Sequence, residues 1–331
     1  MTCYNLGDLP GTSLAEAGDV IASETPLRTI PRLPARGLGS DAVGATLALM
    51  PELPIEKGPR SWRLTTRPQI LTRRVWDRTE RDLDQLEELW GEVEEVQFAV
   101  MGPWSLATRI ELSGGHRVLA DFGALRDLTE VFIGGMGRHA LELHRRFGAR
   151  VSILIEEPDL NSLAAGTVKG TSDFDVIPTV FPKALGERLH AVVAGLRDAG
   201  IESVRLNQLG RHPRVDVARI CAADGVLVSR SAIAGTAMLD EVGQALSQGI
   251  TLGVGTIREG DFLDEDRANP RRHAVAVARL FDELAIPREQ LTHAEIVPAA
   301  PLNGSTLLRA ARALACARVA NEMLEKDAGD L

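Results

Sequence analysis

From about residue 96 onward, short apolar runs alternate with longer amphipathic segments. The short runs are almost continuously apolar, which is typical of parallel strands that are buried on both faces. Six such strands are expected, at Val96–Val100, Val151–Ile155, Ser203–Leu206, Gly225–Val228, Ile250–Val254 and Ala294–Val297. Strands that alternate with helical segments across short joins predict a parallel sheet.

Apolar residues recur at helical spacing in the segments between these strands. Four stripes stand out, at Leu125–Phe147, Leu185–Leu196, Val277–Leu284 and Leu307–Met323. A further helix is expected at Trp76–Trp90, where the acidic run is typical of a solvated helix face. Gly148, Gly200 and Gly249 follow helical segments, as expected for residues that end a helix in the left-handed conformation.

An eight-stranded barrel requires two more strands in the first hundred residues. We expect them at Cys3–Leu6 and at Trp62–Thr65. Residues 26–60 are rich in Pro and Gly, and we interpret them as an extended connection with one short helix near Asp41–Met50. The sequence therefore predicts one (β/α)8 TIM-barrel domain over residues 1–331, because α/β barrels form one domain well above the usual domain size.

The main structural alternative is an open, doubly wound sheet. That fold usually carries a glycine-rich turn after its first strand. Here the Gly253-Val254-Gly255 sequence comes late and lacks the third glycine of the dinucleotide fingerprint. In a barrel it would follow the seventh strand, where loops often bind anions. We interpret it as a tight turn that requires residues without a Cβ.

Composition and charge exclude several classes of partner. The chain has 331 residues and a net charge of −9, which argues against nucleic-acid binding. No apolar stretch approaches the roughly 18 residues that suggest a membrane span. No basic segment followed by an apolar run marks a secretion signal. Three widely separated cysteines form no disulfide framework, which favours the cytoplasm.

Three motifs occur at the ends of expected strands, at Leu6–Thr12, Met101–Trp104 and Ile155–Leu160. In this order and context they resemble the C-terminal catalytic barrel of cobalamin-independent methionine synthase, in the superfamily that includes uroporphyrinogen decarboxylase. The resemblance extends over nearly the whole chain. It implies a barrel whose functional residues lie at the carboxyl ends of the strands.

The resemblance also implies a zinc ion that holds the homocysteine sulfur as a thiolate, the form that attacks a methyl group. The family's four ligands are a His-x-Cys pair, a carboxylate and a second Cys, and they correspond here to Asn207, Leu209, Arg230 and Ala300. Leu and Ala have no donor atom, Arg is permanently positive, and Asn is a poor, hard donor. We therefore expect no zinc or other metal. The family's methyl donor is a methylated folate, and a folate ligand is left open.

Four charged residues are expected at the barrel mouth: Asp8, Glu156, Glu157 and Arg230. Asp8 stands where the family uses a Ser that helps to hold the substrate carboxylate, and Glu156 matches an Asp that pairs with the substrate ammonium. Removing a metal leaves converging carboxylates without compensation, which is costly in a partly buried site. We hypothesise that Arg230 replaces the metal's charge by a salt bridge to Glu156, Asp8 or both.

Alternatives remain open for the candidate ligand-binding residues. Glu156 and Glu157 are either an acid/base pair or cation site, or one faces the pocket while the other makes a structural hydrogen bond. Adjacent strand residues point in opposite directions, so both line the barrel only if the strand has ended. Trp104 either stacks on a flat ligand or packs the loop after the third strand.

Three functions are compatible with this pattern. The first is a methyltransferase-like enzyme that no longer uses zinc, and the second is a non-catalytic barrel that binds a small molecule or a protein partner. The third is a true 5-methyltetrahydropteroyltriglutamate-homocysteine S-methyltransferase, which the substituted ligand positions argue against. The partner that we expect is a small molecule at the barrel mouth. The sequence does not indicate an oligomeric state or a substrate.

Overall fold

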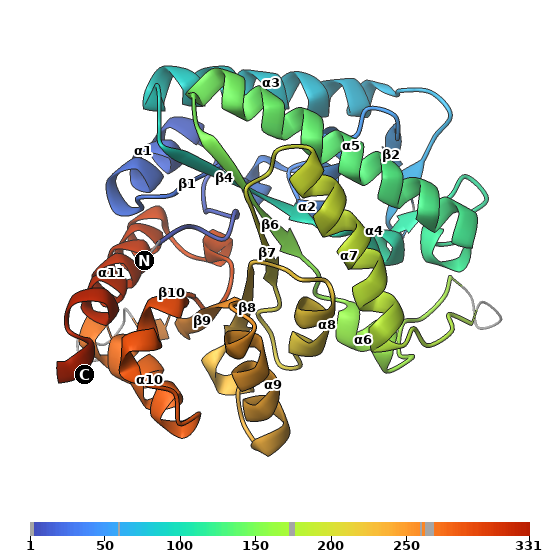
Figure 1. Ribbon diagram of the computed structural model, residues 1–331. Coiled ribbons are helices and arrows are strands. Elements are labelled where there is room, and N and C mark those ends of the chain that lie inside the picture. Colours follow the sequence, from blue (N-terminus) through green and yellow to red (C-terminus); the bar gives the residue numbers. More distant parts are fainter. Residues whose placement is uncertain (1–2, 59, 172–175, 259, 262–267) are drawn as a thin grey trace.

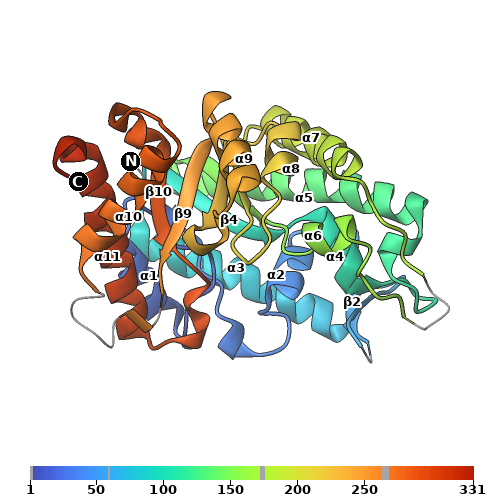
Figure 2. The same cartoon turned by 90° about the horizontal axis from the view of Figure 1, so that it is seen from below.

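The computed structural model describes residues 3–58, 60–171, 176–258, 260–261 and 268–331. Within them, seven parallel strands form a curled sheet in the order β1-β4-β6-β7-β8-β9-β10, surrounded by helices (Figures 1 and 2). The six strands expected from the apolar runs are confirmed as β4 (Glu95–Met101), β6 (Arg150–Glu156), β7 (Ser203–Asn207), β8 (Gly225–Ser229), β9 (Thr251–Ile257) and β10 (Ala294–Pro298). Each pairs with the next in chain order, which gives the sheet its barrel-like curl.

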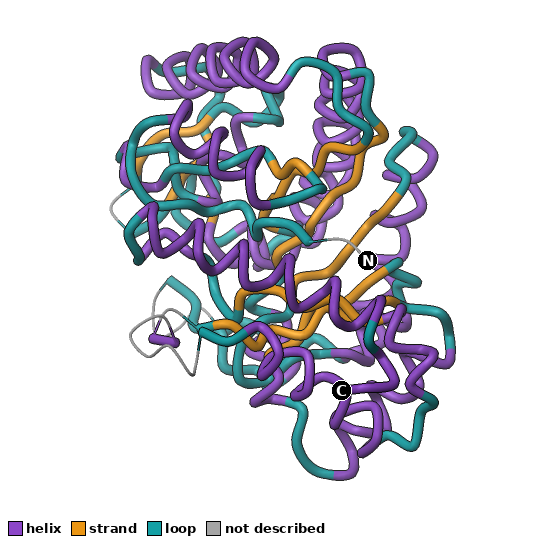
Figure 3. Tube along the Cα trace, turned by 90° about the vertical axis from the view of Figure 1, so that its left-hand side faces the viewer, coloured by secondary structure: helices purple, strands orange, loops and turns teal. Residues whose placement is uncertain are grey.

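Helices cover the outer, convex face of this sheet (Figure 3). They are α1 (Leu14–Glu24), α2 (Ala42–Ala48), α3 (Ile70–Trp90), α4 (Pro103–Arg109), α5 (Phe122–Phe147), α6 (Leu160–Ala164), α7 (Pro182–Asp198), α8 (Val215–Ile220), α9 (Thr236–Ser247), α10 (Pro270–Glu283) and α11 (Leu307–Lys326). All six expected helices are present, as α2, α3, α5, α7, α10 and α11. Gly148 ends α5 in the left-handed conformation, as expected. None of the helices in the described residues combines the length and apolar character needed to cross a bilayer.

The expected second barrel strand at Trp62–Thr65 is wrong. β3 (Trp62–Leu64) lies instead in a small separate sheet with β2 (Ile55–Lys57) and β5 (Ile110–Glu111). The place beside β4 belongs to β1 (Arg28–Thr29). Pro31 follows β1 almost at once and cannot donate to a sheet ladder, so this strand is too short to produce an apolar run.

The other expected strand, Cys3–Leu6, lies beside β1 as a barrel would require, but the segment is not a strand in the structure. It runs parallel to the β1 segment, with the Leu27 N–H 3.4 Å from the Cys3 carbonyl oxygen and the Arg32 N–H 2.9 Å from that of Gly7. It reaches β10 through a side chain, because the Tyr4 hydroxyl donates to Glu295 at 2.8 Å. The described residues thus form a half-barrel, and closure into a (β/α)8 barrel is not shown. That residues 1–331 make one domain stays a prediction.

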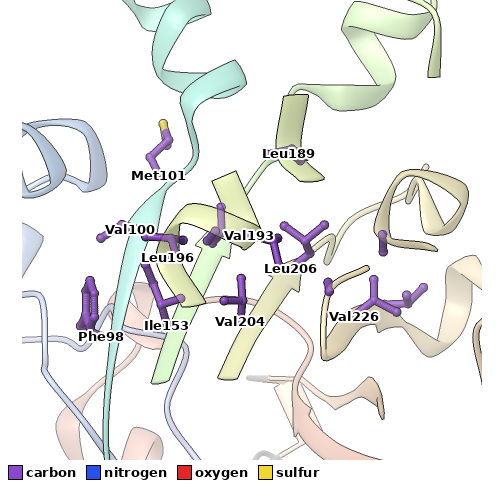
Figure 4. Close-up of a cluster of buried hydrophobic side chains, with 14 of the residues drawn as sticks. Phe98, Val100, Met101, Ile153, Leu189, Val193, Leu196, Val204, Leu206 and Val226 are labelled. Atoms are coloured by element: carbon purple, nitrogen blue, oxygen red, sulfur yellow. The ribbon is translucent and has the colours of Figure 1, made fainter. Parts of the chain in front are cut away.

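One apolar layer lies on each side of the sheet. The outer layer joins strands to helices, and in Figure 4 Val193 and Leu196 of α7 lie against Ile153 and Val204 of the sheet. The inner layer fills the concave side with Tyr4, Leu6, Leu27, Ala99, Leu154, Leu227 and Val297. Burial of this apolar surface on both faces is the main driving force for folding. It also explains why the strands are almost continuously apolar.

Gly253 and Gly255 lie inside β9, so the interpretation of these glycines as a tight turn is wrong. Their role is to leave space on the concave side of the sheet. A Cβ on Gly253 would stand 2.7 Å from the Leu227 side chain, and one on Gly255 would stand 2.5 Å from Leu209. The two glycines therefore let large inward leucines pack against β9.

Replacing Gly253 by Ala should destabilise the fold by about 1–3 kcal/mol, because the added methyl overpacks Leu227. The control is Gly243→Ala in α9, where a Cβ meets its nearest neighbour at an ordinary 3.9 Å. That change should stabilise the protein by up to about 1 kcal/mol through helix propensity. Urea unfolding measures both. A Gly253→Ala protein as stable as the unaltered chain would contradict the packing described here.

Candidate functional site

The carboxyl ends of three neighbouring strands bring candidate residues together. Glu156, the last residue of β6, is aligned with Met101 at the end of β4 and with Asn207 at the end of β7. Asp8 reaches the same edge because its backbone bridges to Arg32, just beyond β1. This edge of the sheet is where parallel α/β folds place their ligands.

A buried guanidinium joins the two carboxylates of this edge. Arg32 Nε lies 2.6 Å from Asp8 Oδ1, and Arg32 Nη2 lies 2.6 Å from Glu156 Oε1. Arg32 Nη1 also donates to the Ala99 carbonyl oxygen at 3.3 Å. The side chain of Arg32 is 7% exposed, while those of Asp8 and Glu156 are 12% and 14% exposed. Distances this short, in a largely dry site, are typical of strong charge-assisted hydrogen bonds.

The charges in this cluster perturb one another. Burial disfavours the charged form of Arg32, but the carboxylates of Glu156 and Asp8 outweigh it and raise the guanidinium pKa. Burial raises the pKa of Glu156, and Asp8 adds to this effect, while Arg32 opposes it. With all three groups ionised, the cluster carries a net charge of −1. It therefore attracts cations rather than anions.

Arg230 forms no salt bridge with Asp8 or Glu156. The hypothesis that it pairs with one or both of these carboxylates is therefore wrong. Arg230 lies just after β8, where its Nη2 pairs with Glu283 of α10 at 2.8 Å and its Nη1 donates to the Ile233 carbonyl oxygen at 3.2 Å. The guanidinium that pairs with both Asp8 and Glu156 is that of Arg32. Sequence reasoning missed Arg32 because it lies in the Pro-rich segment interpreted as a connection.

Glu157 points away from Glu156 and binds the start of α4. One carboxylate oxygen accepts the Trp104 N–H at 3.0 Å, and the other accepts the Ser105 N–H at 2.8 Å and the Ser105 hydroxyl at 2.6 Å. Gly102 makes room for this carboxylate, since a Cβ there would stand 2.3 Å from it. Glu157 therefore satisfies backbone donors that a helix N-terminus leaves free.

The two adjacent glutamates thus have different environments. Glu156 joins the charged cluster at the strand ends, and Glu157 is fully buried and makes structural hydrogen bonds. Glu157 thus makes the structural hydrogen bonds of the second arrangement that the sequence left open, while a pocket at Glu156 stays a prediction. Burial raises the pKa of Glu157 to about 7, although the hydrogen bonds from Ser105 and Trp104 act in the opposite direction.

Trp104 makes the contacts expected of a packing residue. It is buried, its indole N–H donates to the Leu185 carbonyl oxygen at 3.1 Å, and the Arg188 guanidinium lies 5.2 Å from its ring centroid. These contacts tie α4 to α7. A role in stacking on a flat ligand stays a prediction.

The four positions that correspond to the family's zinc ligands do not provide a zinc donor set. The Asn207 side-chain oxygen accepts the Leu209 N–H at 3.0 Å, and Leu209 packs against the inner apolar layer. Arg230 pairs with Glu283, and Ala300 lies in the loop after β10. Among the described residues, no three His, Cys, Asp or Glu side chains gather around a common point. The residues present therefore do not fit zinc, and the absence of the metal stays a prediction.

The cysteines offer no activated sulfur. Cys3, Cys221 and Cys316 are free and buried. Burial raises the pKa of each thiol to about 12. A thiolate is the nucleophilic and metal-binding form, and at neutral pH these side chains remain thiols. The chemistry that the described site can support is therefore that of carboxylates and guanidinium groups.

No protein-family model matches this chain, and no curated protein matches it. Among solved structures, the putative vitamin-B12-independent methionine synthase from Listeria monocytogenes is similar over 96% of each chain, with 11% identity and a TM-score of 0.50. The B12-independent methionine synthase from Shewanella sp. W3-18-1 in complex with selenomethionine is similar over 82% of this chain and 72% of that one, with 12% identity and a TM-score of 0.49. At 11% identity, the similarity to the Listeria monocytogenes structure concerns the fold alone.

The cluster predicts unequal costs for removing two arginines. Arg32→Met leaves two partly buried carboxylates without their cation and should destabilise the fold by about 3–5 kcal/mol. Arg230→Met removes a more exposed pair with Glu283 and should cost about 0–1 kcal/mol. Chemical denaturation of both variants checks this. Equal losses would contradict the assignment of the central charge to Arg32.

Glu157 should make the stability depend on pH. Its pKa is about 7 in the fold, against an ordinary value of 4.5, so the folded state binds more protons between these pH values. The stability that this proton supplies is complete below about pH 4.5 and is lost as the pH rises through about 7. Glu157→Gln cannot titrate and should lack this component. Unfolding free energies from pH 5 to pH 8 measure it, and parallel curves for the two proteins would contradict the raised pKa.

Proposed function

We propose that this chain is a methionine synthase-like barrel protein that binds a small molecule carrying a primary ammonium group at the carboxyl ends of its strands. In this proposal it performs no zinc-dependent methyl transfer to homocysteine. The observation that carries the proposal is the Asp8–Arg32–Glu156 cluster, with two carboxylates on one buried guanidinium. The chain would act in the cytoplasm, with Cys3–Leu6 completing the barrel beside β1.

The free oxygens of the cluster favour an ammonium ligand. Arg32 binds Asp8 Oδ1 and Glu156 Oε1. The second oxygens, Asp8 Oδ2 and Glu156 Oε2, accept no hydrogen bond from the described residues. They are not fully buried, so a ligand can reach them. A carboxylate accepts several hydrogen bonds and an ammonium group donates three, so the remaining oxygens and the net charge of −1 suit this group.

A zinc-independent enzyme is the second candidate. The raised pKa of Glu156 favours it, because general acids and bases work best when their pKa approaches the working pH. Such an enzyme would use Glu156 to transfer a proton to or from the bound amine compound. Turnover of a ligand found by binding experiments separates it from the non-catalytic barrel, which releases the ligand unchanged.

The proposal predicts that methionine binds and that its analogue without the amino group does not. Glu156→Gln should weaken methionine binding by about ten- to a hundredfold, since a hydrogen bond to a charged group contributes about 1.5–3 kcal/mol. Isothermal titration calorimetry measures these affinities, with simple primary amines and a folate in the same panel.

Glu295→Gln is the matched control. Glu295 is also buried and paired with an arginine, Arg205, at 3.3 Å, but it is the second residue of β10 and lies far from that strand's carboxyl end. It should affect stability and leave the dissociation constant unchanged. Equal binding of the deaminated analogue would exclude the ammonium site. Stoichiometric zinc in protein purified without chelators would overturn the zinc-independent part of the proposal.

A further inference from the structure

A second concave site lies outside the sheet, between the N-terminal halves of α5 and α7, which run side by side in Figure 1. The groove has a volume of about 580 Å³. Its walls are mainly apolar and include Leu119, Phe122, Leu125, Ile133, Ile177 and Val180. None of the residues of the Asp8–Arg32–Glu156 cluster lines it. Its size and apolar character are typical of a small-molecule site.

One cation in this groove, Arg188, lacks an anionic partner among the described residues. The Arg188 guanidinium lies over the Trp104 ring, and its Nη1 donates to the Thr129 hydroxyl oxygen at 3.2 Å. Its Nε is buried and donates no hydrogen bond to any described residue. Among the described residues, no carboxylate forms a salt bridge with Arg188. Burial lowers the pKa of this guanidinium, consistent with the loss of solvent around it.

The other charged groups of the groove are already paired on their own helices. Arg126 lies 3.0 Å from Asp127 and 3.9 Å from Glu130, and Glu187 lies 3.7 Å from Lys183. Of the described charged residues that line the groove, Arg188 is thus the one that forms no salt bridge. A partly buried charge without a counterion is unfavourable, and a carboxylate is the anion whose geometry best matches a guanidinium.

We propose that this groove binds an amphiphilic monocarboxylate, with its carboxylate on Arg188 and its apolar body along α5 and α7. A cation that forms no salt bridge with the described residues, in a mainly apolar groove, matches one anionic group on an otherwise apolar molecule. This site is separate from the ammonium site at the strand ends. Neither proposal depends on the other.

Octanoate and the neutral octanol are suitable probes, measured by isothermal titration calorimetry. Octanoate should bind at least about tenfold more tightly than octanol. Arg188→Met should remove this preference while octanol binding remains, and Arg188→Gln should do the same if the first variant folds poorly. Arg126→Met is the matched control, because Arg126 also lines the groove but is paired and exposed. It should keep the preference for octanoate.

A blocking variant tests the location. Ala191 lines the groove and is exposed, so Ala191→Trp should fill it and abolish binding of both probes. Circular dichroism confirms that each variant is folded. Octanoate binding that survives in Ala191→Trp, or that is as tight in Arg188→Met as in the unaltered chain, would overturn the proposal. So would self-association that Ala191→Trp disrupts, since a second copy of the chain would then occupy the groove. Binding of octanoate to Glu156→Gln should be unchanged.

Discussion

A single buried guanidinium organises the carboxyl edge of this sheet. Arg32 lies beyond the two-residue strand β1, and it holds Asp8 from the loop after the first residues and Glu156 from the end of β6. Two carboxylates brought together in a partly buried site would repel each other without a cation. The cluster therefore connects segments 124 positions apart in sequence and sets the charge of the candidate binding site.

Most of the sheet could be predicted because its strands are buried on both faces, as β6 and β8 show. β1 could not, because a strand of two residues beside Pro31 leaves no pattern to detect. The location of Glu156 at a strand end was predictable for the same reason as β6. Its partner was not, because a salt bridge between distant segments has no local signature. Gly253 shows the same limit, since inward packing and not a turn explains it.

Two of the three motifs that carry the family resemblance have structural explanations in this chain. Gly102 leaves space for the Glu157 carboxylate, and Glu157 in turn satisfies the first backbone donors of α4. The Gly-Pro and Glu-Glu-Pro motifs are thus two halves of one packing contact between β4, α4 and β6. Such a contact preserves a fold whatever chemistry the strand ends perform, so the motifs report on architecture more directly than on activity.

The position of Leu209 has a consequence for anyone who wishes to give this scaffold a metal centre. Its side chain is wedged against the inner apolar layer, in space that Gly255 leaves open. Substituting a smaller sulfur- or nitrogen-bearing residue there would open a void at the top of that layer, as well as placing a polar atom beside it. Engineering coordination chemistry into this protein therefore means redesigning the neighbouring strand together with the ligand position.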